Sequence, residues 1–225
     1  MKKFIICAVT IGVVSLLACF LVPQLNLLAC GIVWLVSAFF AFYFFLRYPL
    51  FGYKEIYFAA GCFWGSEKYF KLIDGVISTE VGFANGNTEN PTYKEVYTDT
   101  TGYAECVHVT YNPYMVSLRD LTRMYFHIID PLSLNKQGED EGTRYRTGVY
   151  YSDTKDLKIL QREFARQQKS LQGKMAVELL PLQNFHRAEE YHQDYLNKNP
   201  KGYCHLTPGM FEYARKFNRR LFPLK

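Results

Sequence analysis

Two long apolar runs at the start of the chain constrain its folding more than any other feature. Residues 4–22 are apolar apart from Thr10 and Ser15, and residues 27–46 carry no charge, with a short polar break between the runs. Each run is roughly 20 residues long, enough for a helix to cross about 30 Å of hydrocarbon. Because a helix satisfies its backbone hydrogen bonds internally, the pattern predicts a transmembrane helical hairpin over residues 1–48.

A cleaved signal peptide is the alternative interpretation of the first run. Lys2 and Lys3 precede it, and the residues up to Cys19 faintly resemble a lipobox, which would leave the second run as one anchoring helix. Arg47 and Lys54 follow the second run. The positive-inside tendency therefore favours a cytoplasmic location for residues 49–225, the predicted catalytic domain. An exported domain anchored on the outer side is the alternative.

Charge and cysteine usage exclude two further classes of protein. The chain has 225 residues and a formal charge of +5, and its basic residues are spread out rather than gathered into a nucleic-acid-binding patch. Of its six cysteines, three lie in the apolar runs and leave Cys62, Cys106 and Cys204 in the polar part. An odd, sparse set is not a secreted disulfide framework and indicates buried or reactive thiols.

The part of the chain after the apolar runs alternates between strand-like and helix-like patterns. We expect strands at 55–60, 76–83, 104–111, 147–152 and 175–180, and helices at 66–73, 118–128, 153–171, 188–196 and 210–222. A long polar loop covers residues 130–145, and loops of that length in compact domains tend to be functional. The alternation is typical of a layered α+β or α/β structure.

Gly61-Cys62-Phe63-Trp64-Gly65 is the sharpest motif, and it lies where a strand gives way to a helix. A cysteine at a helix N-terminus meets free N–H groups and the positive end of the helix dipole, which stabilise a thiolate. The flanking glycines let the backbone and a substrate come close. Phe63 and Trp64 supply an apolar wall beside the sulfur. A structural cysteine in an aromatic core is the alternative for this motif alone.

The motif and the segments that follow it resemble the methionine sulfoxide reductase A family. Gly-Cys-Phe-Trp-Gly is the family signature, and the other matching segments occur in the family order at residues 91–93, 102–105, 130–131, 137–146, 188–193 and 202–204. The resemblance covers about residues 55–204. Tyr103 departs from the pattern, because the family usually has His there, and the apolar N-terminal runs are not part of the pattern.

The resemblance implies that the chain reduces methionine S-sulfoxide, free or in proteins, to methionine. Cys62 is the implied nucleophile toward the sulfoxide sulfur, and Glu105 is the implied acid for the oxygen. Glu105 shares a strand face with Val107 and Val109, so we expect burial to raise its pKa and keep a proton available. Cys204, in a segment rich in Gly and Pro, would resolve the Cys62 sulfenic acid by forming a disulfide.

Other roles follow from the resemblance in the same way. Phe63, Trp64, Tyr93, Asp140 and Tyr145 are the implied substrate-site residues. The implied fold is a two-layer α+β sandwich with a ferredoxin-like core, here preceded by the transmembrane hairpin. The implied reductant is a thioredoxin-like dithiol protein, and no cofactor is required.

Two residue sets outside the family pattern carry no predicted function. Cys106 points away from Glu105 on its strand and is expected to be structural. The spacing of His186, His192 and His205 does not put them on one helical face, and no paired Cys ligands occur, so no metal site is predicted.

Two other functions compete with the reductase. In one, Cys62 is the peroxide-reacting thiol of a peroxidase or redox sensor. Comparing peroxide with methionine sulfoxide as substrates distinguishes this function from the reductase. In the other, the chain is a non-enzymatic membrane protein that only binds oxidised methionine, with affinity but no turnover.

Overall fold

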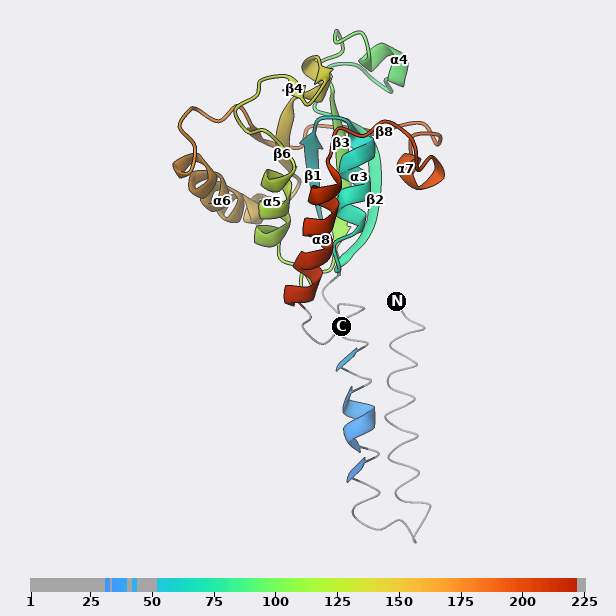
Figure 1. The fold of residues 1–225 in the computed structure, drawn as a ribbon, viewed down its shortest axis with the longest axis vertical. Coiled ribbons are helices and arrows are strands. Elements are labelled where there is room, and N and C mark those ends of the chain that lie inside the picture. Colours follow the sequence, from blue (N-terminus) through green and yellow to red (C-terminus); the bar gives the residue numbers. More distant parts are fainter. Residues whose placement is uncertain (1–30, 33, 40–41, 44–51, 222–225) are drawn as a thin grey trace. The chain divides into compact units, whose positions relative to one another are not determined.

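The structure, a computed structural model, describes residues 31–32, 34–39, 42–43 and 52–221 (Figure 1). The chain divides into two compact units, Met1–Gly52 and Tyr53–Lys225. In the first unit, residues 31–32, 34–39 and 42–43 are helical.

A curled sheet of six strands forms the centre of the second unit (Figure 1). Its strands in sheet order are β7 (Glu178–Pro181), β6 (Thr147–Tyr151), β1 (Lys54–Ala60), β3 (Ala104–Tyr111), β2 (Val76–Ala84) and β8 (Phe185–Arg187). β3 pairs antiparallel with both β1 and β2, so β1 and β2 run in the same direction on either side of it. A separate two-stranded ribbon joins β4 (Lys136–Gln137) to β5 (Asp140–Glu141).

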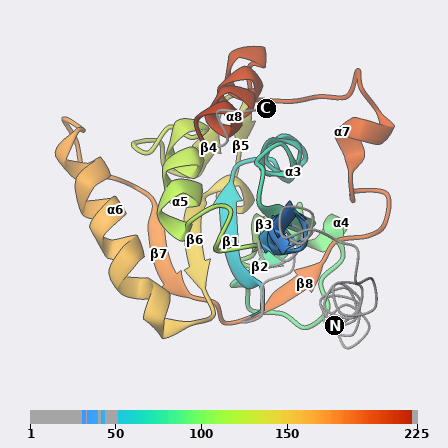
Figure 2. The ribbon, with the colours of Figure 1, turned by 90° about the horizontal axis from the view of Figure 1, so that it is seen from below.

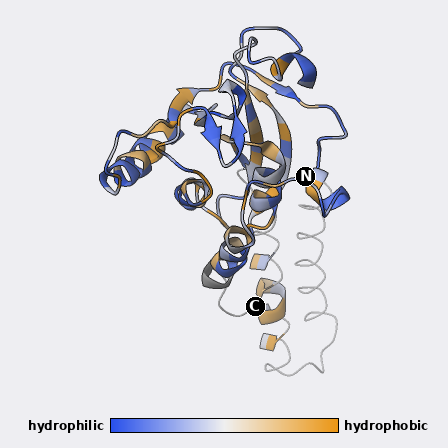
Figure 3. Cartoon of the chain, turned by 45° about the horizontal axis from the view of Figure 1, so that its top comes forward, coloured by the Kyte–Doolittle hydropathy of each residue, from blue (hydrophilic) through white to orange (hydrophobic). Residues whose placement is uncertain are grey.

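Helices α3, α5 and α8 lie together on one face of the sheet, and α6 lies beside α5 (Figure 2). The helices are α3 (Phe63–Lys71), α4 (Tyr93–Val96), α5 (Leu118–His127), α6 (Leu157–Lys169), α7 (Tyr195–Lys198) and α8 (Pro208–Leu221), and short 3-10 turns occur at Thr143–Tyr145 and Thr154–Asp156. Figure 3 shows the hydrophobic residues concentrated on the strands, while α6 is largely hydrophilic. The main core therefore lies between the sheet and its helices.

Alternation along β3 separates the two faces of the sheet, as the sequence predicts. Val107 and Val109 belong to the main core under the helices. Cys106 belongs to a small cluster on the other face. In the main core, the Phe58 ring stacks on Phe70 of α3 at 4.7 Å and on Tyr125 of α5 at 5.1 Å between centroids. These rings hold α3 and α5 against β1.

The described residues correct the predicted fold class. The predicted two-layer sandwich with a ferredoxin-like core behind a transmembrane hairpin is replaced by an α+β fold on one curled sheet, which β7 and β8 extend at its edges. Among the described residues, no helix has both the length and the apolar character to cross a membrane. Most of residues 1–48 lies outside those residues.

The membrane anchor therefore has no support, and neither does the cytoplasmic placement that rests on it. The physical reason is that apolar composition shows which residues avoid water. Composition alone does not show whether such residues avoid water in a bilayer or in a protein interior.

The predicted helix at 188–196 is wrong. Only Tyr195–Lys198 is helical there, and the residues before it form turns. The Gln193 side chain accepts a 2.9 Å hydrogen bond from the Val81 N–H of β2 and donates one of 2.9 Å to the Val81 carbonyl. These contacts with a distant strand replace the hydrogen bonds of a helix.

Candidate active site

Cys62 is the N-cap residue of α3, directly after β1 and Gly61. Gly61 has a φ of +73°, and a Cβ placed there would lie 2.7 Å from Cβ of Gln137. Both facts require glycine. Gln137 is fixed by the Asp130 backbone, whose N–H donates to its Oε1 at 2.8 Å and whose carbonyl accepts from its Nε2 at 2.9 Å. The polar loop therefore packs closely against the turn that carries Cys62.

The Cys62 thiol is buried, with 6% of the residue exposed. Burial raises the pKa of Cys62 well above its ordinary value, and the nearby Glu105 carboxyl raises the pKa further. The Trp64 backbone N–H at the start of α3 acts in the opposite direction but does not compensate. The expectation of a thiolate stabilised by the helix N-terminus is thus wrong for the resting protein, because desolvation outweighs the helix N–H groups.

Glu105 lies on β3 with 1% of its surface exposed. One of its oxygens, Oε2, accepts a 3.0 Å hydrogen bond from the Phe63 N–H in the first turn of α3. Burial raises the pKa of Glu105 to about 8, against the opposing effect of that hydrogen bond. The raised pKa predicted from the strand pattern is confirmed, and the carboxyl is largely protonated at neutral pH.

Phe63 and Trp64 differ in what they face. Phe63 is 1% exposed and packs on Phe83 with centroids 5.9 Å apart, so it belongs to the core. Trp64 is partly exposed, and its indole Nε1–H donates to Nδ1 of His192 at 3.1 Å. The Tyr195 ring stacks on the indole at 3.8 Å and 14°. Trp64 is therefore an apolar surface that is partly exposed to solvent. His192 fixes the edge of its indole ring, and Tyr195 fixes one face.

Two tyrosines face the Cys62 and Glu105 groups from separate elements. Tyr93 begins α4, and its backbone N–H donates to Glu189 at 3.0 Å. Tyr145 is 8% exposed, and burial, with Glu105 nearby, raises its pKa to about 12. Both phenols are hydrogen-bond donors at neutral pH.

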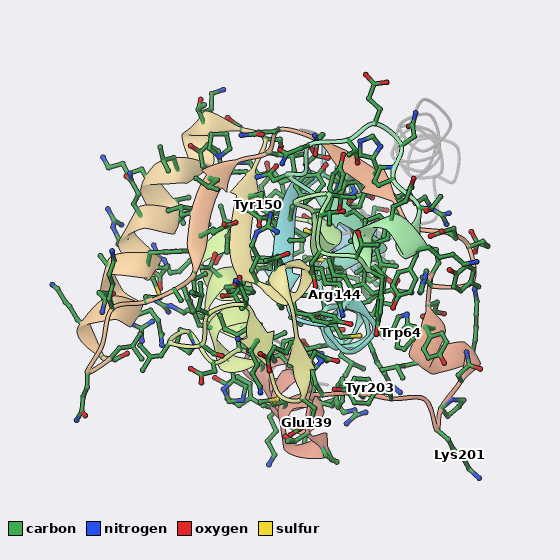
Figure 4. All side chains as sticks on the ribbon, turned by 90° about the horizontal axis from the view of Figure 1, so that it is seen from above. Trp64, Glu139, Arg144, Tyr150, Lys201 and Tyr203 are labelled. Carbon is green, nitrogen blue, oxygen red and sulfur yellow. The ribbon has the colours of Figure 1, made fainter. Side chains whose placement is uncertain are left out.

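Arg144 fixes the turn that carries Tyr145. Its guanidinium lies 4.4 Å from the centre of the Tyr145 ring and forms an ion pair with Asp99. In the view from above, Arg144, Trp64 and Tyr203 are drawn in the same region of the domain (Figure 4). Tyr93, from α4, and Tyr145, from the polar loop, thus lie at the end of the sheet where α3 begins.

Asp140, in the ribbon strand β5, approaches the site from the side of the polar loop. Burial raises the pKa of Asp140, while a hydrogen bond with Tyr203 and the proximity of His205 lower it. Its Oδ2 lies 3.8 Å from Nδ1 of His205. Asp140, Cys62 and His205 each offer a donor atom, and the three atoms lie within 4.8 Å of one another.

Cys204 lies half-buried against the first turn of α3, and both it and Cys62 are free thiols. A Cβ placed on Gly65 would come within 3.0 Å of the Cys204 sulfur and 3.2 Å of Leu206. Because Gly65 has no side chain, the segment that carries Cys204 can pack against it. The space beside Gly65 is therefore filled by this segment, whereas the sequence predicts that the glycine makes room for substrate. The structure brings the predicted site residues to one end of the sheet.

Sequence reasoning assigned no role to His192, Tyr195, Arg144 or His205, all of which contact predicted site residues. His192 and Arg144 lie within segments that match the family, which was the available signal. His205 follows directly after such a segment, and Tyr195 lies two residues beyond the end of another. Spacing in the sequence alone does not reveal these contacts, since His192 lies 128 residues from Trp64.

Comparison with known proteins decides the family. The profile described as peptide methionine sulfoxide reductase matches residues 54–221. The chain belongs to this family. The enzyme of that name from Clostridium acetobutylicum is 53% identical over 153 residues, which cover 68% of this chain and 94% of that protein. The one from Lachnoclostridium phytofermentans is 52% identical over 162 residues, covering 72% and 98%.

Solved structures agree with the family assignment. Mxr1 from Saccharomyces cerevisiae in its reduced form is 41% identical, with a TM-score of 0.66, covering 70% of this chain and 91% of that one. Methionine sulfoxide reductase A of Corynebacterium diphtheriae is 37% identical, with a TM-score of 0.62, covering 68% and 78%. The fold and the reductase signature thus coincide in the same part of the chain.

Proposed function

We propose that the protein reduces the S epimer of methionine sulfoxide, free or in proteins, with Cys62 as the nucleophile. The observation that carries the proposal is the buried Glu105 carboxyl, which is hydrogen-bonded to the N–H of Phe63, next in sequence to Cys62, and has a pKa of about 8. A thiol can take oxygen from a sulfoxide only if that oxygen receives a proton or strong hydrogen bonds. A neutral buried carboxyl at the nucleophile supplies that proton.

In the first step, the Cys62 sulfur attacks the sulfoxide sulfur while Glu105 donates to the oxygen. Tyr93 and Tyr145 donate hydrogen bonds to the same oxygen, and Asp140 supports the site from the polar loop. The oxygen moves to Cys62, so that the thiol and the sulfoxide become a sulfenic acid and a thioether. The buried thiol keeps its proton until substrate arrives, which limits reaction with other oxidants.

In the second step, Cys204 attacks the Cys62 sulfenic acid, forming a disulfide and releasing water. The Cys204 sulfur already lies against the first turn of α3. Two electrons from a thioredoxin-like dithiol protein then regenerate both thiols by thiol–disulfide exchange. Trp64 provides the apolar wall for the methyl group of the substrate.

Turnover of the full chain tests this function. The purified protein is given the S and R epimers of a methionine sulfoxide peptide with dithiothreitol. We expect reduction of the S epimer only, and its loss in Cys62→Ser. Cys106→Ser is the matched control, because Cys106 is buried on the opposite face of the sheet and should leave turnover intact. A folded wild type that reduces neither epimer refutes the proposal.

A further inference from the structure

A second property of the site arises from three side chains that converge from different elements. The Cys62 sulfur comes from the start of α3, the Asp140 carboxylate from β5, and the His205 imidazole from the segment before α8. One donor atom from each lies within 4.8 Å of the other two. Sulfur, nitrogen and carboxylate oxygen are the ligands that Zn²⁺ takes in proteins.

The hydrogen bonding of these groups is incomplete. The His205 side chain is 3% exposed, and its Nδ1, the ring nitrogen that faces Asp140, has no hydrogen-bond partner. Oδ2 of Asp140, 3.8 Å from that ring, is also buried without a partner. Buried polar atoms are nearly always paired, so unpaired atoms on two side chains that face one another point to a missing third group.

We propose that Cys62, Asp140 and His205 form an inhibitory binding site for Zn²⁺ or a cation of similar softness. Donor atoms in a tetrahedral zinc site lie roughly 3.3–3.8 Å apart, given bonds of about 2.0–2.3 Å. The three side chains close to that spacing by small rotations, and a water molecule takes the fourth position. On binding, the Cys62 thiol releases its proton to solvent and its sulfur bonds to the metal.

Metal binding removes the nucleophile from use. A sulfur bonded to zinc has donated electron density to the metal and is a weaker nucleophile, and the metal occupies the space in front of it. Asp140, as a ligand, is held by the metal and withdrawn from its substrate role. Occupancy therefore switches reduction off without oxidising or consuming any thiol, and a chelator restores it. This consequence rests on the proposed function, whereas the binding itself does not.

The test measures metal binding in the absence of any sulfoxide. The full chain is stripped of metal, reduced with a phosphine so that no added thiol competes, and titrated with zinc against a chromophoric chelator. Cobalt serves as a spectroscopic substitute, since a thiolate ligand gives a charge-transfer band. We expect one zinc per chain beyond the level bound by Cys62→Ser, with one proton released per zinc.

Variants decide which residues hold the metal. His205→Ala and Asp140→Asn should each weaken zinc binding by about 100-fold or more, because loss of a direct ligand exceeds the 10–100-fold cost of losing a second-layer contact. His186→Ala is the histidine control and Cys106→Ser the thiol control, and both should bind as the wild type does. Cys204→Ser should also keep the affinity.

Three outcomes overturn the site. The first is that Cys62→Ser binds as much zinc as the wild type. In the second, His205→Ala keeps full affinity. The third is loss of zinc binding in Cys204→Ser, because that result would show that the Cys62 and Cys204 thiols bind the metal together. Failure of the sulfoxide assay leaves these readings unchanged, so the two proposals fail separately.

Discussion

The Phe63 backbone N–H donates a 3.0 Å hydrogen bond to the Glu105 carboxyl and so connects the first turn of α3 to strand β3. Glu105 and Cys62 are positioned by one contact, since Phe63 follows Cys62 directly. The bond goes to a carboxyl that burial keeps protonated. In the proposed mechanism, this contact places the proton donor beside the attacking thiol.

The rate of sulfoxide reduction should fall as the pH rises through about 8. Glu105 has a pKa of about 8, so its acid form is lost above that pH. Glu105→Gln should lower kcat by about 100-fold or more, the usual contribution of a general acid. The pH profile of kcat for wild type and variant checks this; an inflection near pH 8 that persists in Glu105→Gln would assign it to another group.

Glu105 should also make the stability of the fold depend on pH. Its folded pKa of about 8 lies above the ordinary value of 4.5. The folded state therefore binds the proton more tightly, and its contribution to stability is complete below pH 4.5 and lost as the pH rises toward 8. The slope is at most about 1.4 kcal/mol per pH unit. Urea unfolding between pH 5 and 8 should show this loss in the wild type and a smaller one in Glu105→Gln.

Gly65→Ala should impair resolution of the sulfenic acid more than its formation. The added Cβ would lie 3.0 Å from the Cys204 sulfur and displace the segment that carries it. Quenched-flow measurements should show one methionine released per enzyme at a near-normal rate, followed by slow loss of the Cys204 thiol. Gly209→Ala is the matched control, because its Cβ would meet only Thr207 Oγ1, at 3.8 Å. Equal disulfide rates in the two variants would contradict the prediction.

His192→Phe should raise KM for a sulfoxide peptide more than it lowers kcat. The variant keeps a ring but removes the acceptor of the 3.1 Å hydrogen bond from the Trp64 indole, worth about 1 kcal/mol. A freed indole should also change the near-ultraviolet circular dichroism. Tyr195→Phe keeps the stacked ring and serves as the control. A pure loss of kcat with unchanged KM would show that His192 acts in the chemistry.

Alkylation should distinguish the three described thiols. Cys204 is half-buried, whereas Cys106 has no exposed surface and burial raises its pKa well above the ordinary value. Mass spectrometry after brief iodoacetamide treatment of the reduced protein should find Cys204 modified first, Cys62 slowly, and Cys106 only after unfolding. Early modification of Cys106 would contradict its structural assignment.

Local patterns in the sequence predicted most of the central elements. β3 occupies the expected residues, and α5 begins at the expected Leu118, after Ser117, whose hydroxyl accepts a 3.1 Å hydrogen bond from the Asp120 N–H. Alternation placed Glu105 on the buried face. In each case the decisive forces act between residues a few positions apart.

Elements that depend on distant partners were missed. β8 pairs with β2 only over Gly82–Ala84, and its three residues are too few to give a strand pattern. The two-stranded ribbon of β4 and β5, which positions Asp140, lies within the polar loop, whose sequence shows no strand pattern. The raised pKa of Cys62 could not be predicted either, because the sequence shows the helix N-terminus but not the depth of burial that opposes it.

The short strand β8 and the Gln193 side chain also shorten the row of unpaired backbone groups that the sheet offers beside β2. Oxidation turns a buried methionine polar and loosens the core of the damaged protein, which then exposes extended segments. Such segments add to any sheet that offers a long row of unpaired N–H and C=O groups. Here three residues end the sheet beside β2, and Gln193 occupies the N–H and C=O of Val81. An edge shortened in this way offers a smaller template for strand addition by the exposed segments of an oxidised protein.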